Sequence, residues 1–163
     1  MKKHKIINII AGEGGHLAQA KRFIALERDL FTDVNYILIT DANITIPNVE
    51  CYIERNISNY TKQRNITNLL KFTFAFARLF FNSLLYVVKR KPEVLISFGP
   101  VLAIPYLFWG KLLGVKVIHI ETWSRFYTKS FAGRVAYLLA DKFVIQNKEL
   151  QKLYPNSIYG GRL

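Results

Sequence analysis

The sequence predicts an α/β protein built on a Rossmann-like, doubly wound parallel sheet, and three observations point to that class. Short β-branched runs alternate with helix-prone stretches along the whole chain, which is the pattern of successive βαβ units. The first of these runs leads directly into a glycine-rich turn at residues 12–15. The length of 163 residues suits one core, so we expect residues 1–163 to form a single domain.

The expected strands are the places where Val, Ile and aromatic residues gather between turn-forming residues. The clearest lie at 5–10, 35–40, 94–97, 115–120 and 142–145, and weaker ones at 49–53 and 157–160. Residues 5–10 follow a basic lead-in like that of a signal peptide, but the apolar run is short and glycines follow at once, so we expect a strand. Helical patterns lie at 15–29, 65–90, 101–113, 130–140 and 148–153.

Four loops are candidates for a functional site. In a doubly wound sheet, ligands bind beyond the carboxyl ends of the strands, at the point where the strand order reverses. Loops with glycine or polar residues follow four of the expected strands, at 12–16, 41–43, 97–100 and 121–125. We therefore expect these loops to converge on one site.

The composition restricts the partners. The formal net charge is +12, which predicts an anionic partner such as nucleic acid, a phosphorylated ligand or an acidic membrane surface. No nucleic-acid-binding signature accompanies the charge, so we expect no nucleic-acid partner. Cys51 is the single cysteine and has neither a disulfide partner nor companion metal ligands. We expect no metal and no cofactor.

The segment at about 65–90 is unusually apolar for a surface helix. Between residues 69 and 88 the only charges are Lys71 and Arg78, and a helical projection places both on one narrow stripe. A membrane-spanning helix would hold Arg78 near its midpoint, at a cost of about 2.5–3.5 kcal/mol. We expect partial burial on the sheet together with docking onto an anionic membrane surface, while a wholly buried core helix is the alternative. The expected membrane contacts are Lys71, Phe72, Phe76, Phe80, Phe81, Lys89 and Arg90.

The glycine loop matches no complete nucleotide-binding motif. Gly12 and Gly14 fit a dinucleotide fingerprint, but its last position is Leu17, and no Lys-Ser/Thr pair follows Gly15 as in a Walker loop. Glycines still allow a ligand to approach the backbone, and a helix N-terminus favours anionic oxygens. His16, in the first turn, could take a proton from an attacking hydroxyl near neutral pH. The loop alone equally permits a histidine that only caps or packs.

The later loops add backbone and charged groups. Ser97, Gly99 and Pro100 form a strand-to-helix turn that suits a phosphate or a sugar, although ordinary turns have the same composition. Glu121 falls just past a strand, where we expect an exposed carboxylate that holds sugar hydroxyls or acts as a base. Arg125 adds positive charge for a diphosphate.

Four segments, in order, make the chain recognisable. They are "GEGGH", "SFGP" with "AIP", "IETWSR" leading to "LADKFVIQ", and "YP" with "IYGG". Together they resemble the PssD and Alg-fourteen type of glycosyltransferase subunit, and more distantly the N-terminal half of MurG. The resemblance runs from about Lys5 to Leu163. It implies the acceptor-side half of a GT-B glycosyltransferase, with the nucleotide-sugar half on a separate partner chain and the active site between them.

The resemblance also implies roles for individual residues. It places Gly12, Gly14, Gly15 and His16 in the acceptor-phosphate and catalytic loop, and Ser97 and Gly99 beside the cleft; Glu121, Ser124 and Arg125 match the segment that faces it. Two features depart from the family: Asn147 stands where many relatives have tryptophan, and the N-terminal membrane anchor of eukaryotic members is missing. Membrane attachment is therefore expected to depend on segment 65–90 or on the partner.

The predicted function is a subunit of an inverting two-component glycosyltransferase in polysaccharide biosynthesis. It would transfer a sugar, with a UDP-sugar as the family's donor, to a polyprenyl-diphosphate-linked sugar at the cytoplasmic face of the membrane, as a peripheral or shallowly inserted protein. His16 or Glu121 would serve as the base. The main alternative is a non-catalytic membrane platform that binds and activates the partner chain. A nucleotide-cofactor oxidoreductase is disfavoured by the incomplete fingerprint and the missing second domain.

Overall fold

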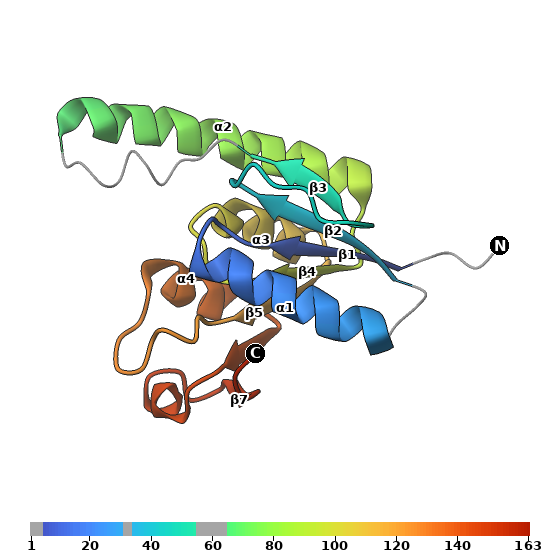
Figure 1. Cartoon of the computed structure of the whole chain (residues 1–163). Coiled ribbons are helices and arrows are strands. Elements are labelled where there is room, and N and C mark those ends of the chain that lie inside the picture. The colour runs from blue at the N-terminus through green and yellow to red at the C-terminus, as the bar shows by residue number, and fades with distance from the viewer. Residues whose placement is uncertain (1–4, 31–33, 55–64) are drawn as a thin grey trace.

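The computed structural model describes residues 5–30, 34–54 and 65–163, and its centre is a seven-stranded sheet (Figure 1). The strands are β1 (Lys5–Ile10), β2 (Val34–Thr40), β3 (Glu50–Ile53), β4 (Val94–Ser97), β5 (Lys116–Ile120), β6 (Lys142–Ile145) and β7 (Ile158–Tyr159). Their order across the sheet is β3-β2-β1-β4-β5-β6-β7, and every neighbouring pair is parallel. The predicted fold class is confirmed.

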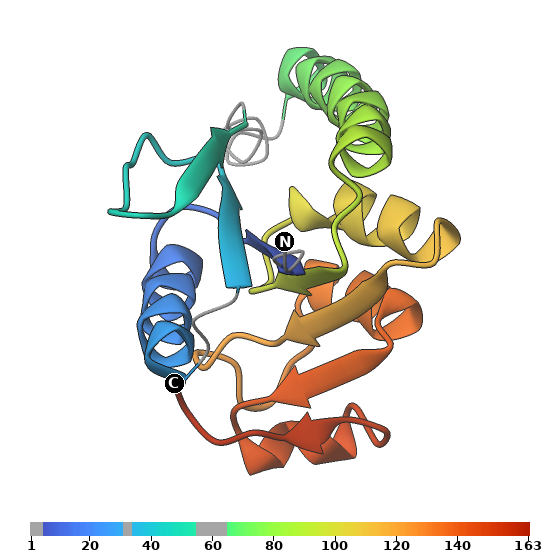
Figure 2. The ribbon, with the colours of Figure 1, turned by 90° about the vertical axis from the view of Figure 1, so that its right-hand side faces the viewer.

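The helices follow the strands as predicted, and no predicted boundary is wrong by more than two residues. They are α1 (Gly15–Leu30), α2 (Ile66–Arg90), α3 (Ala103–Leu112), α4 (Phe131–Leu139) and the short 3₁₀ helix η2 (Lys148–Lys152). Helix α1 lies on one side of the sheet, and α2, α3 and α4 lie on the other (Figure 2). Both faces of the central strands are therefore buried, which explains why their sequences are almost continuously apolar.

The strand order reverses between β1 and β4. Ile10 pairs with Ser97 at the carboxyl ends of these two strands, and the amide of Phe98 donates to the carbonyl of Ile10 at 3.0 Å. From this point the chain after β1 turns toward α1 on one face, while the chain after β4 turns toward α3 on the other. Such a divergence leaves a crevice between the two loops.

Helix α2 is only partly buried. Asn65 caps its start by accepting the amide of Asn68 at 2.8 Å, and Lys91 ends it in the left-handed conformation. By length and composition alone it could cross a membrane, and 22% of its most apolar window is buried. The alternative of a wholly buried core helix is therefore wrong. Its fully buried residues all lie in the second half, at Leu79, Ser83, Tyr86 and Val87.

Three of the four phenylalanines expected to contact a membrane face the protein instead. Phe80 packs against Trp109 of α3, with ring centroids 4.8 Å apart, and its carbonyl accepts the indole N–H at 2.8 Å. Phe72 and Phe76 stack on each other at 5.7 Å and pack on the core. Only Phe81 is truly exposed, at 65%. Because α2 is apolar on almost every side, its sequence could not reveal which face α3 covers.

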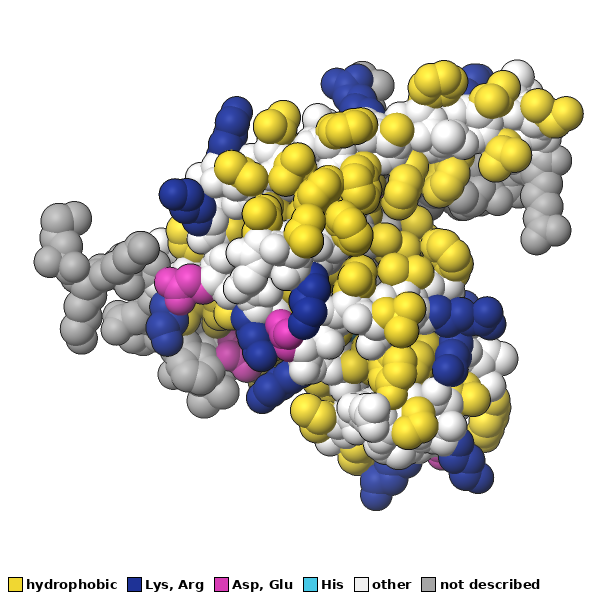
Figure 3. All heavy atoms as spheres, turned by 180° about the vertical axis from the view of Figure 1, so that it is seen from behind, with side chains coloured by type: hydrophobic (Ala, Val, Ile, Leu, Met, Phe, Trp, Pro, Cys, Tyr) yellow, Lys and Arg dark blue, Asp and Glu magenta, His cyan; other side chains and the backbone are white. Residues whose placement is uncertain are grey.

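A different set of side chains points outward from α2. We call it the outer stripe: Ile66, Leu70, Phe74, Phe81, Leu85 and Val88. Spacings of mostly three and four residues place these side chains on one helix face, and their exposure ranges from 49% at Val88 to 79% at Ile66. Lys71 and Lys89 are exposed on the adjoining face. The apolar side chains along α2 are visible in Figure 3.

Candidate functional site

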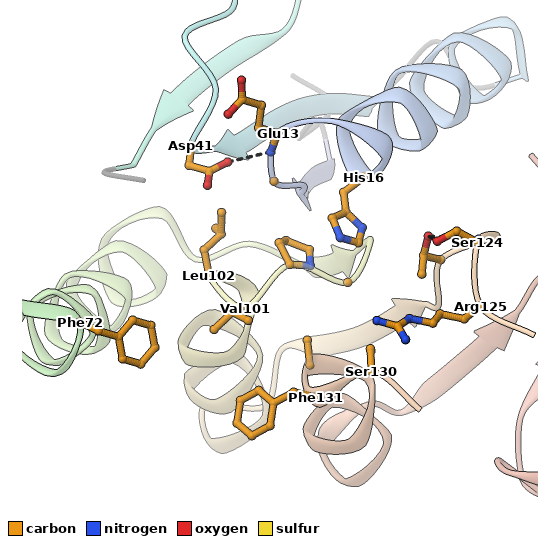
Figure 4. Close-up of a pocket in the computed structure, with 15 residues that line it drawn as sticks. Glu13, His16, Asp41, Phe72, Val101, Leu102, Ser124, Arg125, Ser130 and Phe131 are labelled. Atoms are coloured by element: carbon orange, nitrogen blue, oxygen red, sulfur yellow. Dashed lines mark hydrogen bonds between the residues drawn. The ribbon is translucent and has the colours of Figure 1, made fainter. Parts of the chain in front are cut away.

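A cavity of about 370 Å³ lies at the carboxyl edge of the sheet. All four candidate loops contribute to its wall, together with one residue of α2 and the start of α4 (Figure 4). Its lining residues are Gly12, Glu13, His16, Asp41, Phe72, Gly99, Pro100, Val101, Leu102, Thr122, Ser124, Arg125, Ser130, Phe131 and Ala132. The structure thus brings segments from six parts of the chain to one place.

His16 lies at this cavity, in the first turn of α1. Burial lowers the pKa of its imidazole below the ordinary value of 6.5. The backbone of Phe98 and the carboxyl groups of Glu121 and Asp41 raise that pKa, and Arg125 lowers it, without reversing the direction. A neutral imidazole can accept a proton, so His16 is held in the form that a general base requires.

Gly99 is the residue against which the His16 ring rests. A Cβ atom at position 99 would lie 3.1 Å from Cε1 of His16, a tight contact that the ring could relieve only by a small shift. Gly99 also has a φ of 99°, which other residues rarely adopt. Two independent constraints therefore favour glycine here, and one of them is the position of the imidazole.

Arg125 and Ser124 form the polar wall opposite α2. Arg125 donates to the hydroxyl of Thr128 at 3.0 Å, and none of the salt bridges within the described ranges involves it. Its guanidinium points into the cavity (Figure 4). The hydroxyl of Ser124 is 3.1 Å from that of Thr122. A cation without a carboxylate partner at a cavity is suited to phosphate oxygens.

Glu121 does not occupy the exposed position that the sequence predicted. It is 0% exposed and is not among the residues that line the cavity. One carboxyl oxygen accepts the hydroxyl of Tyr154 at 3.1 Å, the other accepts the amide of Thr122 at 3.1 Å, and both lie within 3.3 Å of the Ser130 hydroxyl. Ser130 in turn caps α4 by accepting the amide of Gly133 at 2.8 Å. The carboxyl group therefore ties β5 to the start of α4.

Buried amides connect the glycine loop to the segment after β5. Gln146 donates to the side chain of Gln19 at 2.5 Å and to the carbonyl of Glu121 at 3.0 Å. Gln19 donates to the Thr122 hydroxyl and to the carbonyl of Gly15, each at 3.2 Å. Because both glutamines are buried, these bonds fix the two loops relative to each other.

Asn147, at the position where the resemblance led us to expect tryptophan, holds the loop that carries Arg125. Its side-chain amide donates to the carbonyl of Trp123 at 2.7 Å and also to the carbonyl of Arg125. Its oxygen accepts two bonds from the guanidinium of Arg162. Asparagine at this position therefore has a structural role in positioning the cation.

Three other predicted residues lie beside the cavity without lining it. The Ser97 hydroxyl is 0% exposed and accepts the amide of Gly99 at 3.2 Å. Gly14 turns the chain with a φ of 81°, and its carbonyl accepts the amide of Ala18 at 3.1 Å. Gly15 has open space where a Cβ would lie. Gly12 does line the cavity, and a Cβ atom at this position would lie 3.0 Å from Cβ of Pro100.

The residues that the sequence did not nominate form much of the remaining wall. The sequence indicated Asp41 only as the start of the candidate loop 41–43, and Ser130 only as the start of a helical pattern. Phe72, which the sequence nominated only as a membrane contact, and Phe131 bring aromatic rings from α2 and α4. No sequence signal identifies these two, because their place at the cavity depends on how the helices pack.

Comparison with known proteins gives one family. The family described as "Oligosaccharide biosynthesis protein Alg14 like" matches residues 7–163. A human relative, named UDP-N-acetylglucosamine transferase subunit ALG14, is 24% identical over 177 residues, which cover 96% of this chain and 82% of the human protein. The Candida albicans protein of the same name is 27% identical over 183 residues, with 99% and 82% coverage.

Solved structures show the same fold at low identity. The Acinetobacter baumannii MurG structure superposes with a TM-score of 0.66 at 14% identity and covers 99% of this chain. A UDP-N-acetylglucosamine 2-epimerase structure has a TM-score of 0.65 at 13% identity and covers 96%. The chain spans 44% and 46% of the lengths of these two proteins. It therefore corresponds in fold to one half of such enzymes.

Proposed function

The chain belongs to the Alg14-like family of oligosaccharide biosynthesis proteins, and on that basis we propose that it is the acceptor-side subunit of a two-component glycosyltransferase. The donor is a UDP-sugar, with UDP-N-acetylglucosamine as the first candidate because the curated relatives bear that name. The acceptor is a sugar carried on a polyprenyl diphosphate at the cytoplasmic face of a membrane. Residues 1–163 form one Rossmann-like acceptor-side domain.

The observation that carries this proposal is the two-sided character of the cavity. His16, Ser124 and Arg125 lie along one side, while Phe72 and Phe131 lie along the other (Figure 4). Phe72 belongs to α2, the helix that also bears the outer stripe. A ligand with a charged diphosphate and an attached hydrocarbon chain has complementary chemistry on both sides.

The mechanism follows from the groups at the cavity. Arg125 holds the diphosphate through charge-assisted hydrogen bonds. The neutral imidazole of His16 takes the proton from the acceptor hydroxyl as that oxygen attacks the anomeric carbon of the donor sugar. The bond from the anomeric carbon to the nucleotide breaks on the opposite side, and the UDP leaves on the partner. The configuration at that carbon is therefore inverted.

The nucleotide-sugar half is assigned to a partner chain. The chain spans less than half the length of the glycosyltransferase structure that it resembles, and its relatives are named as subunits. Ligands of a doubly wound sheet bind beyond the carboxyl ends of its strands, so the partner is expected to cover the edge where His16 and Arg125 lie.

The membrane contact is assigned to the outer stripe and the lysines beside it. Apolar side chains on one face with basic residues next to them match a helix lying in the interface of an anionic bilayer. Phe74→Glu with Phe81→Glu is expected to abolish flotation with anionic vesicles. Leu138→Glu is the matched control, because Leu138 is 81% exposed on α4 and lies outside the stripe. Equal flotation of all variants would show that the outer stripe does not contact the membrane.

The test of the function is a sugar-transfer assay with the partner chain co-expressed. We expect transfer only when both chains are present, and a loss of about 10²–10⁴-fold in rate for His16→Ala while the two chains still co-purify. Neither chain should act alone. Absence of transfer from any UDP-sugar to a prenyl-diphosphate acceptor would overturn the proposal.

The same assay distinguishes the catalytic function from the alternative of a non-catalytic membrane platform. A platform that only recruits and activates the partner would keep its effect in His16→Ala. Arg125→Ala adds a second discriminating variant, since a lost cation should raise the KM for the acceptor and leave that for the donor unchanged. If both variants behave like the wild type, the platform function replaces the catalytic one.

A further inference from the structure

Asp41 is a charged group at the cavity that the proposed mechanism does not use. It follows β2 and is half-buried. Its Oδ1 atom accepts the backbone amide of Glu13 at 2.8 Å, so that the carboxylate is anchored to the glycine loop. Oδ2 takes part in no hydrogen bond among the described residues and can accept one from a ligand, since one carboxylate can accept several hydrogen bonds. The carboxyl group of Glu13, in contrast, points away from the cavity (Figure 4).

Within the part of the chain that the structure describes, this carboxylate forms no salt bridge with a lysine or an arginine. The salt bridges found in residues 5–30, 34–54 and 65–163 join Glu50 and Asp141 to lysine or arginine, and none involves Asp41. The guanidinium of Arg125 lies on the opposite side of the cavity (Figure 4). The cavity is therefore divided, with a negative group on one side and a positive group on the other.

The division restricts how a diphosphate-linked sugar can lie. A phosphate beside Asp41 would place two negative groups together, which is unfavourable in a partly buried site. A phosphate beside Arg125 gains a charge-assisted bond. The part of the ligand that faces Asp41 must therefore be uncharged and must donate hydrogen bonds, as sugar hydroxyl groups do.

His16 lies where the two parts of such a ligand meet. Its pKa is influenced in opposite directions by Asp41 and Arg125, as expected for a ring with both groups nearby. A sugar held by the carboxylate would present a further hydroxyl to the imidazole. One oxygen of Asp41 accepts a hydrogen bond from the loop that bears His16. This bond fixes the positions of the two side chains relative to each other.

We propose that Asp41 is a specificity-determining residue that binds a hydroxyl group of the acceptor sugar and so positions the sugar for His16. This inference rests on the proposed function and adds the orientation of the acceptor: the sugar toward Asp41, the diphosphate toward Arg125. Sites that hydrogen-bond a substrate hydroxyl discriminate strongly against analogues that lack it. The acceptor sugar, and not only its lipid carrier, is then recognised by this subunit.

Asp41→Asn, in complex with the partner chain, is the variant that tests the proposal. The amide oxygen can still accept the Glu13 amide, so the loop should keep its structure. The probes are a short-chain prenyl diphosphate that carries N-acetylglucosamine and the same prenyl diphosphate without sugar. We expect the variant to bind the sugar-bearing probe about ten- to a hundredfold more weakly, to bind the sugarless probe as well or better, and to keep the KM for the donor.

Glu93→Gln is the matched control, because Glu93 is exposed in the turn before β4 and the substitution removes the same charge away from the cavity. A deoxy analogue of the acceptor sugar provides a test on the wild-type protein. Loss of the correct hydroxyl should weaken binding to the wild type and have little further effect on Asp41→Asn, as coupled partners behave in a double-mutant cycle.

Two outcomes overturn the inference while the proposed function stands. One is equal weakening of both probes by Asp41→Asn, which would show that Asp41 only supports the loop. The other is unchanged binding of the sugar-bearing probe. If the wild-type complex binds neither probe and transfers no sugar to a prenyl-diphosphate acceptor, the proposed function fails and the inference fails with it.

Discussion

The loop after β1 and the loop after β5 occupy equivalent places in the fold and have different roles. Each follows a buried strand at the carboxyl edge of the sheet, and each leads to a titratable side chain that the sequence nominates as a base, Glu121 directly after β5 and His16 in the first turn of α1. His16 lies at the cavity, whereas Glu121 is fully buried and bonded to Ser130 and Tyr154. A position at a strand end thus identifies the loop, but the groups packed behind it decide where the side chain points.

The difference has a physical cause in what lies beneath each loop. Behind Glu121 stand hydroxyl groups of Ser130 and Tyr154, which satisfy a buried carboxyl group. Beside His16 lies Gly99, which offers the ring a surface without a side chain. The first loop therefore keeps its polar group for a ligand, while the second uses its polar group to hold α4 against the sheet. Substitutions at the two loops should have opposite consequences.

The largest expected effect is the loss of stability in Glu121→Ala. The change leaves the Thr122 amide and the hydroxyls of Ser130 and Tyr154 without their buried acceptor. With about 1 kcal/mol or more for each such group, the free energy of unfolding should fall by about 3 kcal/mol. His16→Ala should lower it by less than about 1 kcal/mol. Denaturant unfolding of the two variants provides the measurement.

Glu121→Gln sharpens the same test. Its amide oxygen retains part of the network, so it should be more stable than Glu121→Ala and should keep most of the transfer activity. Loss of activity in Glu121→Gln at full stability would instead give the carboxyl group a chemical role and would erase the contrast between the two loops.

A smaller effect is expected from adding one methyl group behind the second loop. A Cβ at Gly133 would lie 1.9 Å from Oε2 of Glu121 and 2.7 Å from the hydroxyls of Ser130 and Tyr154. Gly133→Ala must therefore displace the network, and we expect it to destabilise the fold by about 1–3 kcal/mol. Gly15→Ala is the matched control in the first loop, because nothing lies within 4 Å of its Cβ position. Equal unfolding midpoints for both variants would contradict the packing that distinguishes the loops.

The elements of the fold were predictable because their signals are local. The strand at residues 5–10 and the turn at Gly12 follow from β-branched runs and glycines, and the parallel sheet follows from their alternation with helices. The convergence of the loops follows from the reversal of strand order between β1 and β4. The same rule could have nominated Asp41 as a site residue, because it is the polar residue that directly follows β2.

The directions of side chains were not predictable from the sequence. On α2 nearly every position is apolar, so nothing in the sequence separates Phe80, which packs on α3, from Phe81, which is exposed. Glu121 was expected to be exposed because it falls just past a strand, at the edge of the sheet where the candidate loops lie. Its partner Tyr154 lies 33 residues further along the chain. Both errors concern contacts between elements distant in sequence.

The smallest expected effect is a displacement of the pH profile of the first loop's base. Burial lowers the pKa of His16 below 6.5, so the imidazole stays neutral, and able to accept a proton, at pH values where a free histidine is already protonated. The acid limb of kcat/KM for the acceptor reports this group in the free enzyme, and we expect its midpoint below pH 6.5. Residual activity of His16→Ala should lack that limb. An acid limb with its midpoint at or above pH 6.5, or one that persists in His16→Ala, would assign the titration to another group. His16 would then not be the general base.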